Sequence, residues 1–430
     1  MSPPVKSQPS RSALVSAILY LSVAAIIAVA LMMRYRHEKP SSPVIVHNLP
    51  LQILANFGHA SLGSMPSSLA VGKQGDIYIL TVTGGPRGNG MLSKYSEQTG
   101  KIAPLLPLCG GIGLGNAPPS NLVTDRHGFV YATQFTNQNS STMELVSLFS
   151  RQTGTTPLIT SSKNEILTIV GHHKNIIYLS GSDVNGTQPP RLLQYNLSNH
   201  SHSTLYTFAK PVTRQPGESI GSSCSSLVSA KRGWLYGVDS DTNFHGYEGF
   251  GDVFKISPKG SLTIDHVFSK LRYFLRNKDG ANPVQLASDS NGNIYGITAR
   301  GGSGGNGVLF SITPEDTFTV LHNFSATRNG KNRSGVHPTC IVVSPNGDVF
   351  GAADLGGLHQ NGAIFCYLPH SHLFEVIHEF ASAKQTTGQQ EGAQPLALAF
   401  NTPDTLIGVT QFGGNFGGGT LFKLNVHGIH

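Results

Sequence analysis

A pattern that returns about every 55 residues from residue 50 to the end constrains this chain more than any other feature. After a turn, each copy has an aromatic or apolar residue, at Tyr78, Tyr131, Tyr178, Tyr236, Tyr295, Phe350 and Ile407. A proline stands twelve residues before five of these seven positions, at Pro66, Pro119, Pro283, Pro338 and Pro395. A glycine stands three residues before five of them, at Gly75, Gly128, Gly233, Gly292 and Gly347. A sevenfold recurrence in which each offset is kept in five copies predicts a tandem array of one structural unit.

Each copy has the composition of four short strands separated by turn residues. In the sixth copy the predicted strands are Thr339–Ser344, Asp348–Ala353, Ala363–Leu368 and Leu373–Phe380. They are rich in Val, Ile and Phe and are bounded by Pro, Asn and Gly, which is typical of strands joined by tight turns. No helical periodicity follows residue 34. Only 12% of the residues are charged and 39% are hydrophobic, so a coiled coil or a disordered chain is excluded.

The fourth strands determine how the array ends. Seven segments have this character: 51–57, 101–108, 155–160, 203–208, 262–268, 318–324 and 374–380. The first precedes any first strand, and the last copy has no fourth strand of its own. We therefore predict an all-β, seven-bladed β-propeller in which 51–57 completes the C-terminal blade, so that no strand edge stays exposed. An open solenoid is the alternative, because ring closure is inferred from strand counting alone.

Three consecutive copies carry a glycine-rich motif. They read YGITARGGSGGNGVLFSI (295–312), FGAADLGGLHQNGAIFCYL (350–368) and IGVTQFGGNFGGGTLFKL (407–424). These segments resemble the "GloVer" tandem repeat of choice-of-anchor bacterial proteins. The first three copies depart from the motif and are assigned by spacing. The resemblance implies a propeller-like surface or bacterial envelope protein anchored at one terminus, with no established reaction. Kelch repeats share the glycine pair, but their recurring tryptophan is absent, because Trp234 is the single tryptophan.

The N-terminal segment from Ser12 to Met33 is 22 residues long and uncharged. As a helix it would extend about 33 Å, enough to cross a hydrocarbon core of about 30 Å. We predict a short polar tail (1–11), a transmembrane signal-anchor helix (12–33), a Pro/Ser linker (34–50) and the propeller (51–430). A cleaved signal peptide is the alternative, since Ala28-Val29-Ala30 resembles a cleavage site. The flanking positive charges are nearly balanced, and large domains translocate regardless of them, so we expect the propeller on the extracytoplasmic side.

The sequence contains few candidate catalytic residues. Among the starts of the first strands, Glu165 and His337 are the only candidates near a channel mouth, and the sequence predicts neither a metal nor a cofactor. The glycine loops precede strands and not helices, so they do not indicate phosphate binding. His266, His322 and His378 occupy one repeat position and are interpreted as structural. The four cysteines are far apart, and buried thiols are expected.

Charge is distributed unevenly along the chain. The formal net charge is +7, and basic residues concentrate in the connections from each fourth strand to the next first strand. In an up-and-down blade these connections share a face with the glycine loops. We predict a ligand-binding face formed by Arg272, Arg276, Lys278, Arg328, Lys331 and Arg333. The alternative is that these loops bind no ligand and are polar because they are solvated.

These observations favour a membrane-anchored, non-catalytic binding or scaffold propeller. The basic face suits an anionic glycan, a lipid headgroup or an acidic protein. Aromatic residues near these charges are few, so nucleic acid is not expected, and the propeller is expected to be a monomer. The alternative is a propeller enzyme of the hydrolase, lyase or lactonase type with its site at the channel mouth.

Overall fold

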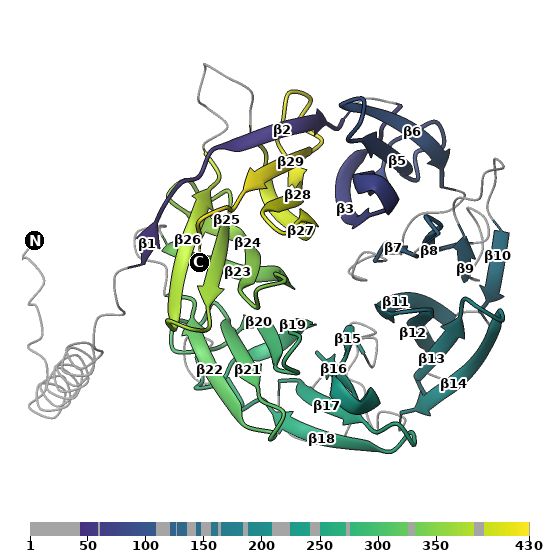
Figure 1. Cartoon of the computed structure of the whole chain (residues 1–430), viewed down its shortest axis with the longest axis vertical. Coiled ribbons are helices and arrows are strands. Elements are labelled where there is room, and N and C mark those ends of the chain that lie inside the picture. The colour runs from purple at the N-terminus through teal and green to yellow at the C-terminus, as the bar shows by residue number, and fades with distance from the viewer. Residues whose placement is uncertain are drawn as a thin grey trace, which may run out of the picture. The chain divides into compact units, whose positions relative to one another are not determined.

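The computed structural model describes residues 44–58, 61–108, 121–125, 127–135, 143–147, 156–161, 165–183, 188–208, 224–240, 250–271, 276–325, 332–381 and 391–429. Within the compact unit Ile45–His430 the described strands form seven sheets arranged in a ring around a central opening (Figure 1). The prediction of an all-β propeller is therefore confirmed. The predicted transmembrane segment 12–33 lies outside the described residues, among which no helix is long and apolar enough to cross a membrane.

Six of the sheets have four strands and one has five, and the strands within each repeating unit pair in an antiparallel up-and-down order. The first three sheets along the chain consist of β3 (Ser64–Val71), β4 (Ile77–Thr83), β5 (Met91–Ser96) and β6 (Lys101–Pro107); β7 (Val123–Thr124), β8 (Val130–Phe135), β9 (Met143–Ser147) and β10 (Thr156–Thr160); and β11 (Glu165–His173), β12 (Ile176–Asp183), β13 (Arg191–Asn196) and β14 (Ser201–Thr207).

The other sheets carry the clearest glycine motifs. They consist of β15 (Ser226–Ser229), β16 (Leu235–Asp239), β17 (Asp252–Ile256) and β18 (Leu262–Val267); β19 (Ala281–Ser288), β20 (Ile294–Arg300), β21 (Val308–Ile312) and β22 (Phe318–Asn323); β23 (Asn332–Val343), β24 (Val349–Gly357), β25 (Ala363–Leu368) and β26 (Leu373–Glu379) with β1 (Ile45–Val46); and β27 (Ala393–Thr402), β28 (Thr405–Phe412) and β29 (Thr420–Asn425) with β2 (Leu51–Asn56). Two short 3-10 turns, η1 (Lys73–Gly75) and η2 (Lys231–Gly233), join first to second strands.

The two ends of the propeller sequence meet in one sheet, as predicted from the strand count. β2 pairs antiparallel with β29, with Leu51 opposite Leu424 and Asn56 opposite Thr420. β3, the first strand of the next sheet, contacts β27 and β28 of this sheet and β7 of the sheet that follows. The N-terminal strand therefore completes the C-terminal sheet and closes the ring visible in Figure 1.

The end of the predicted linker 34–50 belongs to the folded unit. β1 adds to β26 in parallel, with Ile45 opposite Glu375. The His47 Nε2 atom lies 2.9 Å from Glu375 Oε2, and the His378 ring contacts the Leu49 carbonyl through Nδ1 at 2.9 Å. The chain is thus fixed to the outer edge of the β23–β26 sheet before it enters β2.

The recurring prolines contact a second set of glycines, distinct from those of the turns between first and second strands. A glycine that precedes the third strand of one sheet faces the proline of the next first strand, as in Gly307 and Pro338. A Cβ atom at Gly307 would lie 3.0 Å from Pro338 Cδ and 2.1 Å from the Thr298 carbonyl oxygen. The residue before that proline, His337, donates its backbone N–H to the Asn306 carbonyl at 3.3 Å. The same arrangement joins Gly251 to Pro283, Gly362 to Pro395 and Gly419 to Pro66.

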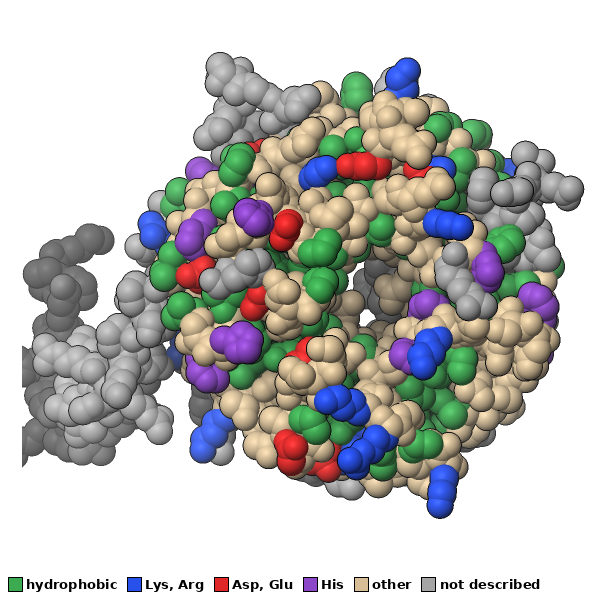
Figure 2. All heavy atoms as spheres, in the orientation of Figure 1, with side chains coloured by type: hydrophobic (Ala, Val, Ile, Leu, Met, Phe, Trp, Pro, Cys, Tyr) green, Lys and Arg blue, Asp and Glu red, His purple; other side chains and the backbone are tan. Residues whose placement is uncertain are grey.

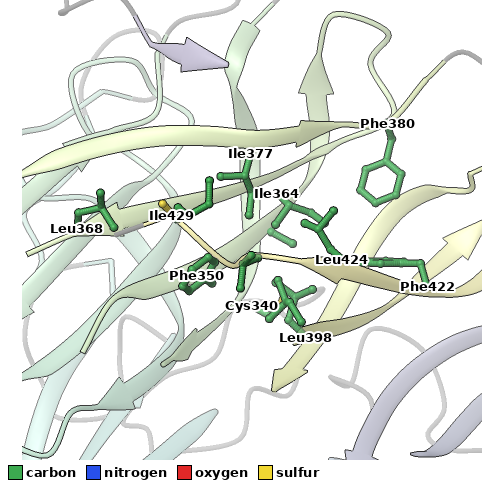
Figure 3. Close-up of a cluster of buried hydrophobic side chains, with 14 residues drawn as sticks. Cys340, Phe350, Ile364, Leu368, Ile377, Phe380, Leu398, Phe422, Leu424 and Ile429 are labelled. Carbon is green, nitrogen blue, oxygen red and sulfur yellow. The ribbon is translucent and has the colours of Figure 1, made fainter. Parts of the chain in front are cut away.

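The hydrophobic core lies between neighbouring sheets. In the cluster of Figure 3, Phe350, Ile364 and Ile377 of one sheet pack against Leu398, Phe422 and Leu424 of the next. Ile429, beyond the last strand, covers this cluster. Replacing a buried phenylalanine of this kind by alanine costs about 3–5 kcal/mol. Cys224, Cys340 and Cys366 are buried thiols, as predicted, and Cys109 lies outside the described residues.

Two of the repeat-position histidines, His266 and His322, join neighbouring sheets through their outer strands. The ring of His266 stacks on Phe318 of the next sheet with centroids 3.6 Å apart, and His322 stacks on Phe374 at 3.5 Å. His266 and His378 also contact carboxylates, Asp279 at 3.2 Å and Glu391 at 3.4 Å. The structural interpretation of these histidines is confirmed.

Candidate functional site

The central channel contains a pocket of about 320 Å³ lined by both polar and apolar residues. All seven sheets contribute to its wall, through Ser67, Asn121, Thr168, Ser226, Gln285, Thr339 and Leu398 among others. Most of these side chains are neutral hydroxyls and amides. The channel is therefore suited to hydrogen bonding with a small polar molecule, and its wall carries little charge.

Side chains of the inner strands also hold neighbouring sheets together. The Ser226 hydroxyl accepts the Leu286 N–H at 3.1 Å, and the Gln285 Oε1 atom accepts the Ile341 N–H at 2.9 Å. The Thr339 hydroxyl donates to the Pro395 carbonyl at 2.9 Å. Each bond crosses from one inner strand to the next, so it satisfies a buried backbone group that no ladder reaches. The polar wall is thus part of the ring's construction.

The two sequence-predicted candidates at the channel differ in their surroundings. His337 lines the channel pocket, and its Nδ1 atom lies 3.1 Å from both carboxylate oxygens of Asp354. A carboxylate at Nδ1 fixes the ring and favours the tautomer in which Nε2 accepts a proton. Glu165 is buried and forms an ion pair with Arg191 at 2.5 Å. His337 therefore has the geometry of a general base, whereas Glu165 is neutralised by its partner. Within the described ranges, no group of three His, Cys, Asp or Glu side chains is placed to hold a metal ion.

The connections between sheets and the glycine loops share one face, as the sequence predicted. Asn277 Oδ1 accepts the Gly302 N–H at 2.7 Å, and Asn361 Nδ2 donates to the Ala381 carbonyl at 2.6 Å. Both bonds join a glycine loop to the connection that follows the fourth strand. We call this side the glycine-loop face; it comprises the described residues of 269–280, 301–307, 325–333, 354–362, 381–392 and 411–419.

Half of the predicted basic site is described. Lys278 and Arg333 are exposed on the glycine-loop face, and Arg276 is half-buried there. Arg272, Arg328 and Lys331 lie outside the described residues. Asp279, next to Lys278, accepts bonds from His266 and from the Ser269 backbone, and these outweigh burial so that the pKa of Asp279 is lowered. The Asp279 carboxylate is therefore bonded within its own loop and strand. Lys278 is exposed beside it and faces solvent.

The sequence did not indicate the apolar residues of this face. Six large hydrophobic side chains are exposed in the described part of the chain, and four of them lie within two adjacent glycine loops or at the ends of the strands that enter them: Leu355, Leu358, Phe412 and Phe416. Phe416 is the most exposed, at 57%. The signal available in the sequence was their position, since large apolar residues stand within or beside glycine-rich turns, which lie at the surface.

The fold and the central channel define the class of protein as a β-propeller. A family profile for the Gloeobacter/Verrucomicrobia repeat matches residues 160–334 and 262–429, more than half of the chain. The chain belongs to this family, which confirms the resemblance seen in its glycine motifs. A sequence search of curated proteins gave no match.

Three solved structures similar to this chain match it at low sequence identity. A catalytically inactive variant of virginiamycin B lyase from Staphylococcus aureus, with quinupristin, is 13% identical with a TM-score of 0.50, covering 88% of this chain and 99% of its own. Oligogalacturonate lyase from Vibrio parahaemolyticus is 8% identical with a TM-score of 0.53, covering 89% and 94%. The extracellular domain of a hybrid two-component system from B. thetaiotaomicron is 12% identical with a TM-score of 0.51, covering 86% of this chain and 39% of that one. These likenesses concern the fold alone.

Proposed function

We propose that this chain is a membrane-anchored, non-catalytic binding module in which the seven sheets act as the blades of one closed ring. The observation that supports a binding role is the concentration of exposed Leu and Phe side chains in two adjacent glycine loops. Monomeric proteins rarely expose several large apolar residues together unless a partner covers them. Hydrogen bonds between neighbouring sheets hold these loops on a rigid scaffold, which lowers the entropic cost of binding.

The partner we propose is an acidic protein. Leu355, Leu358, Phe412 and Phe416 supply the apolar centre of an interface, and Lys278 and Arg333 supply cations on the same face. An apolar centre with a charged rim is the usual anatomy of a protein interface. An anionic glycan would make little use of Leu and Phe side chains. A lipid headgroup, the other anionic partner expected from the sequence, is an outcome of the test below.

The N-terminal segment supplies the anchor in this proposal. Ser12–Met33 is long enough to span a bilayer, and the positive charges on either side leave the propeller free to be exported. An anchored binding module on the extracytoplasmic side would meet its partner at the envelope.

Site-specific photo-cross-linking in cells tests the interface. A photoreactive phenylalanine analogue at Phe416 is expected to capture one discrete protein, whereas the same analogue at Leu373, exposed to a similar degree as Leu358 but at the start of β26 and outside this face, is not. Adding K278E and R333E should weaken capture at least tenfold. Capture of lipid alone, equal capture from Leu373, or indifference to charge reversal would each overturn the proposed interface.

A second candidate function rests on the His337–Asp354 pair at the channel. A histidine oriented by a carboxylate beside a pocket is suited to general base catalysis, as expected for a propeller enzyme of the lyase, hydrolase or lactonase type. Two of the similar structures are named as lyases. If the chain is such an enzyme, H337Q should abolish turnover of a lactone or uronate substrate, and D354N should lower kcat about 10²–10⁴-fold. Turnover unchanged by both substitutions would exclude this assignment.

A further inference from the structure

A second pocket, of about 490 Å³, lies away from the glycine-loop face, at the boundary between the β15–β18 and β19–β22 sheets. Turns that join first to second strands and third to fourth strands form it. Figure 2 shows basic and acidic side chains side by side at the boundary between these two sheets. The pocket is lined by Ala230, Lys231, Arg232, Trp234, Tyr236, Lys255, Asn291, Gly292, Pro314, Glu315 and Asp316, and we call it the Trp234 pocket.

The inner charges of the Trp234 pocket satisfy one another. Lys255 Nζ lies 2.5 Å from Asp316 Oδ2 and 3.1 Å from Asp265 Oδ1, and it stands 5.6 Å from the centroid of the Trp234 ring. The Tyr236 hydroxyl donates to Asp316 Oδ1 at 3.1 Å. Burial favours loss of the lysine proton, but the two carboxylates outweigh it, so the pKa of Lys255 is raised and the ammonium stays charged.

This inner ion pair has a structural counterpart elsewhere. Lys423, at the equivalent position of the last sheet, reaches Glu97 of the next sheet at 2.8 Å. A third-strand lysine that bonds to a carboxylate of the following sheet is thus a device for joining sheets. The Lys255–Asp316 pair alone does not indicate a ligand.

The outer charges of the pocket are different. Lys231 and Arg232 form one wall and Glu315 stands on another, yet among the ion pairs of the described residues none includes any of these three side chains. The pocket therefore presents two unpaired cations and an unpaired carboxylate across an open volume. A ligand that satisfies both walls needs an anionic group for the cations and hydroxyl donors for Glu315 and Asp316.

Trp234 and Lys255 narrow the class of ligand. Trp234 is half-buried and contributes apolar surface to a pocket whose volume is within the range of small-molecule sites. The Lys255 ammonium close to the indole ring would repel a ligand cation, so a zwitterion with an ammonium group is disfavoured there. A ring that bears hydroxyls and one carboxylate fits each of these requirements.

We propose that the Trp234 pocket binds a saccharide containing a uronic acid. Lys231 and Arg232 bind the carboxylate, Glu315 and Asp316 accept hydroxyl protons, and the sugar ring lies beside Trp234. This site is independent of the proposed protein interface, because its lining residues belong to turns outside the glycine-loop face.

The chain carries its own reporter for this site, because Trp234 is its single tryptophan. Titrating the full-length protein in neutral detergent with digalacturonate should give a saturable change in tryptophan emission. The neutral methyl ester of digalacturonate is the matched probe and should bind at least tenfold more weakly. K231E with R232E should weaken digalacturonate binding at least tenfold.

The chain also offers a matched control variant. η1 has the sequence Lys-Gln-Gly where η2 has Lys-Arg-Gly, so K73E makes the same charge change as the single variant K231E, at the equivalent turn of another sheet. K73E should leave the titration unchanged. Equal binding of the neutral ester, an equal response to sodium sulfate, or an equal effect of K73E and K231E would overturn the proposal, as would the absence of a saturable response from a folded protein.

Discussion

At the scale of single residues, His322 illustrates how the ring uses polar side chains without charge. Its imidazole stacks on Phe374 in the next sheet, and its buried Nε2 atom has no hydrogen-bond partner in the described structure. Burial lowers the pKa of His322 from 6.5 to about 3. His266 and His378, at the same repeat position, instead lie beside carboxylates. One repeat position thus holds one neutral histidine and two histidines that lie beside carboxylates.

The first prediction concerns the pH dependence of stability. The unfolded chain protonates His322 near pH 6.5 but the folded chain does not, so the folded state loses stability as the pH falls from 6.5 towards 3. H322F keeps a stacked ring and removes the titration. Between pH 7 and pH 5 it should therefore lose about 1–2 kcal/mol less free energy of unfolding than the parent chain. Urea unfolding at both pH values measures this; equal losses in the two proteins would contradict it.

The sequence revealed some residue roles better than others. It identified the prolines and glycines as periodic and His337 as the histidine at the channel, because each depends on local position. It could not show that Gly307 faces Pro338, or that Lys231 and Glu315 share a pocket, because those pairs join different sheets. Loop side chains such as Phe416 follow no periodicity, so their exposure became visible only once the strands around them were placed.

The contact between Gly307 and Pro338 gives a second prediction. Gly307 has φ +102°, and an added Cβ would meet both the Thr298 carbonyl and the proline ring. G307A should therefore lower the free energy of unfolding by about 2–4 kcal/mol, from backbone strain and overpacking together. Gly347 has φ +94° with open space around it, so G347A isolates the strain, about 1–2 kcal/mol. Equal thermal midpoints for the two variants would show that the proline contact contributes nothing.

At the scale of elements, the two N-terminal strands have unequal roles. β2 supplies the outer strand of the last sheet, and Phe57 directly after it is fully buried. β1 is two residues long and adds to an outer strand in parallel, with Ile45 largely exposed. The sequence predicted β2 because its pattern matches six other fourth strands. It did not predict β1, because two residues carry no periodicity.

This difference gives a third prediction. Removing residues 1–56 leaves the edge of β29 without its partner, so the protein should be destabilised and prone to associate through that edge. In the full-length chain, F57A should cost about 3–5 kcal/mol. Removing only residues 1–43 retains β1 and β2 and should leave the thermal midpoint nearly unchanged. Size-exclusion chromatography and thermal unfolding compare the truncated chains; a monomeric, equally stable 57–430 fragment would contradict ring closure by β2.

At the scale of the whole molecule, the ring separates its sites. Bonds between neighbouring inner strands fix the channel, the glycine loops form one face, and the Trp234 pocket is built from turns outside that face. Propeller sheets make this separation possible because successive connections alternate between the two ends of the strands. A ligand in the Trp234 pocket and a protein on the glycine-loop face would therefore not compete for the same residues.

The last prediction concerns the anchor that would hold such a ring at a membrane. Ser12–Met33 contains no charge, so the full-length chain should remain in the membrane fraction after an alkaline wash. L21K with A24K places two charges near the centre of this segment, at about 2.5–3.5 kcal/mol each, and should release the chain to the supernatant. L21V with A24L is the matched apolar control and should stay with the membrane. Mass spectrometry of the N-terminus decides the alternative: a mature chain that begins after Ala30 would show a cleaved signal peptide, because an anchor must retain residues 12–33.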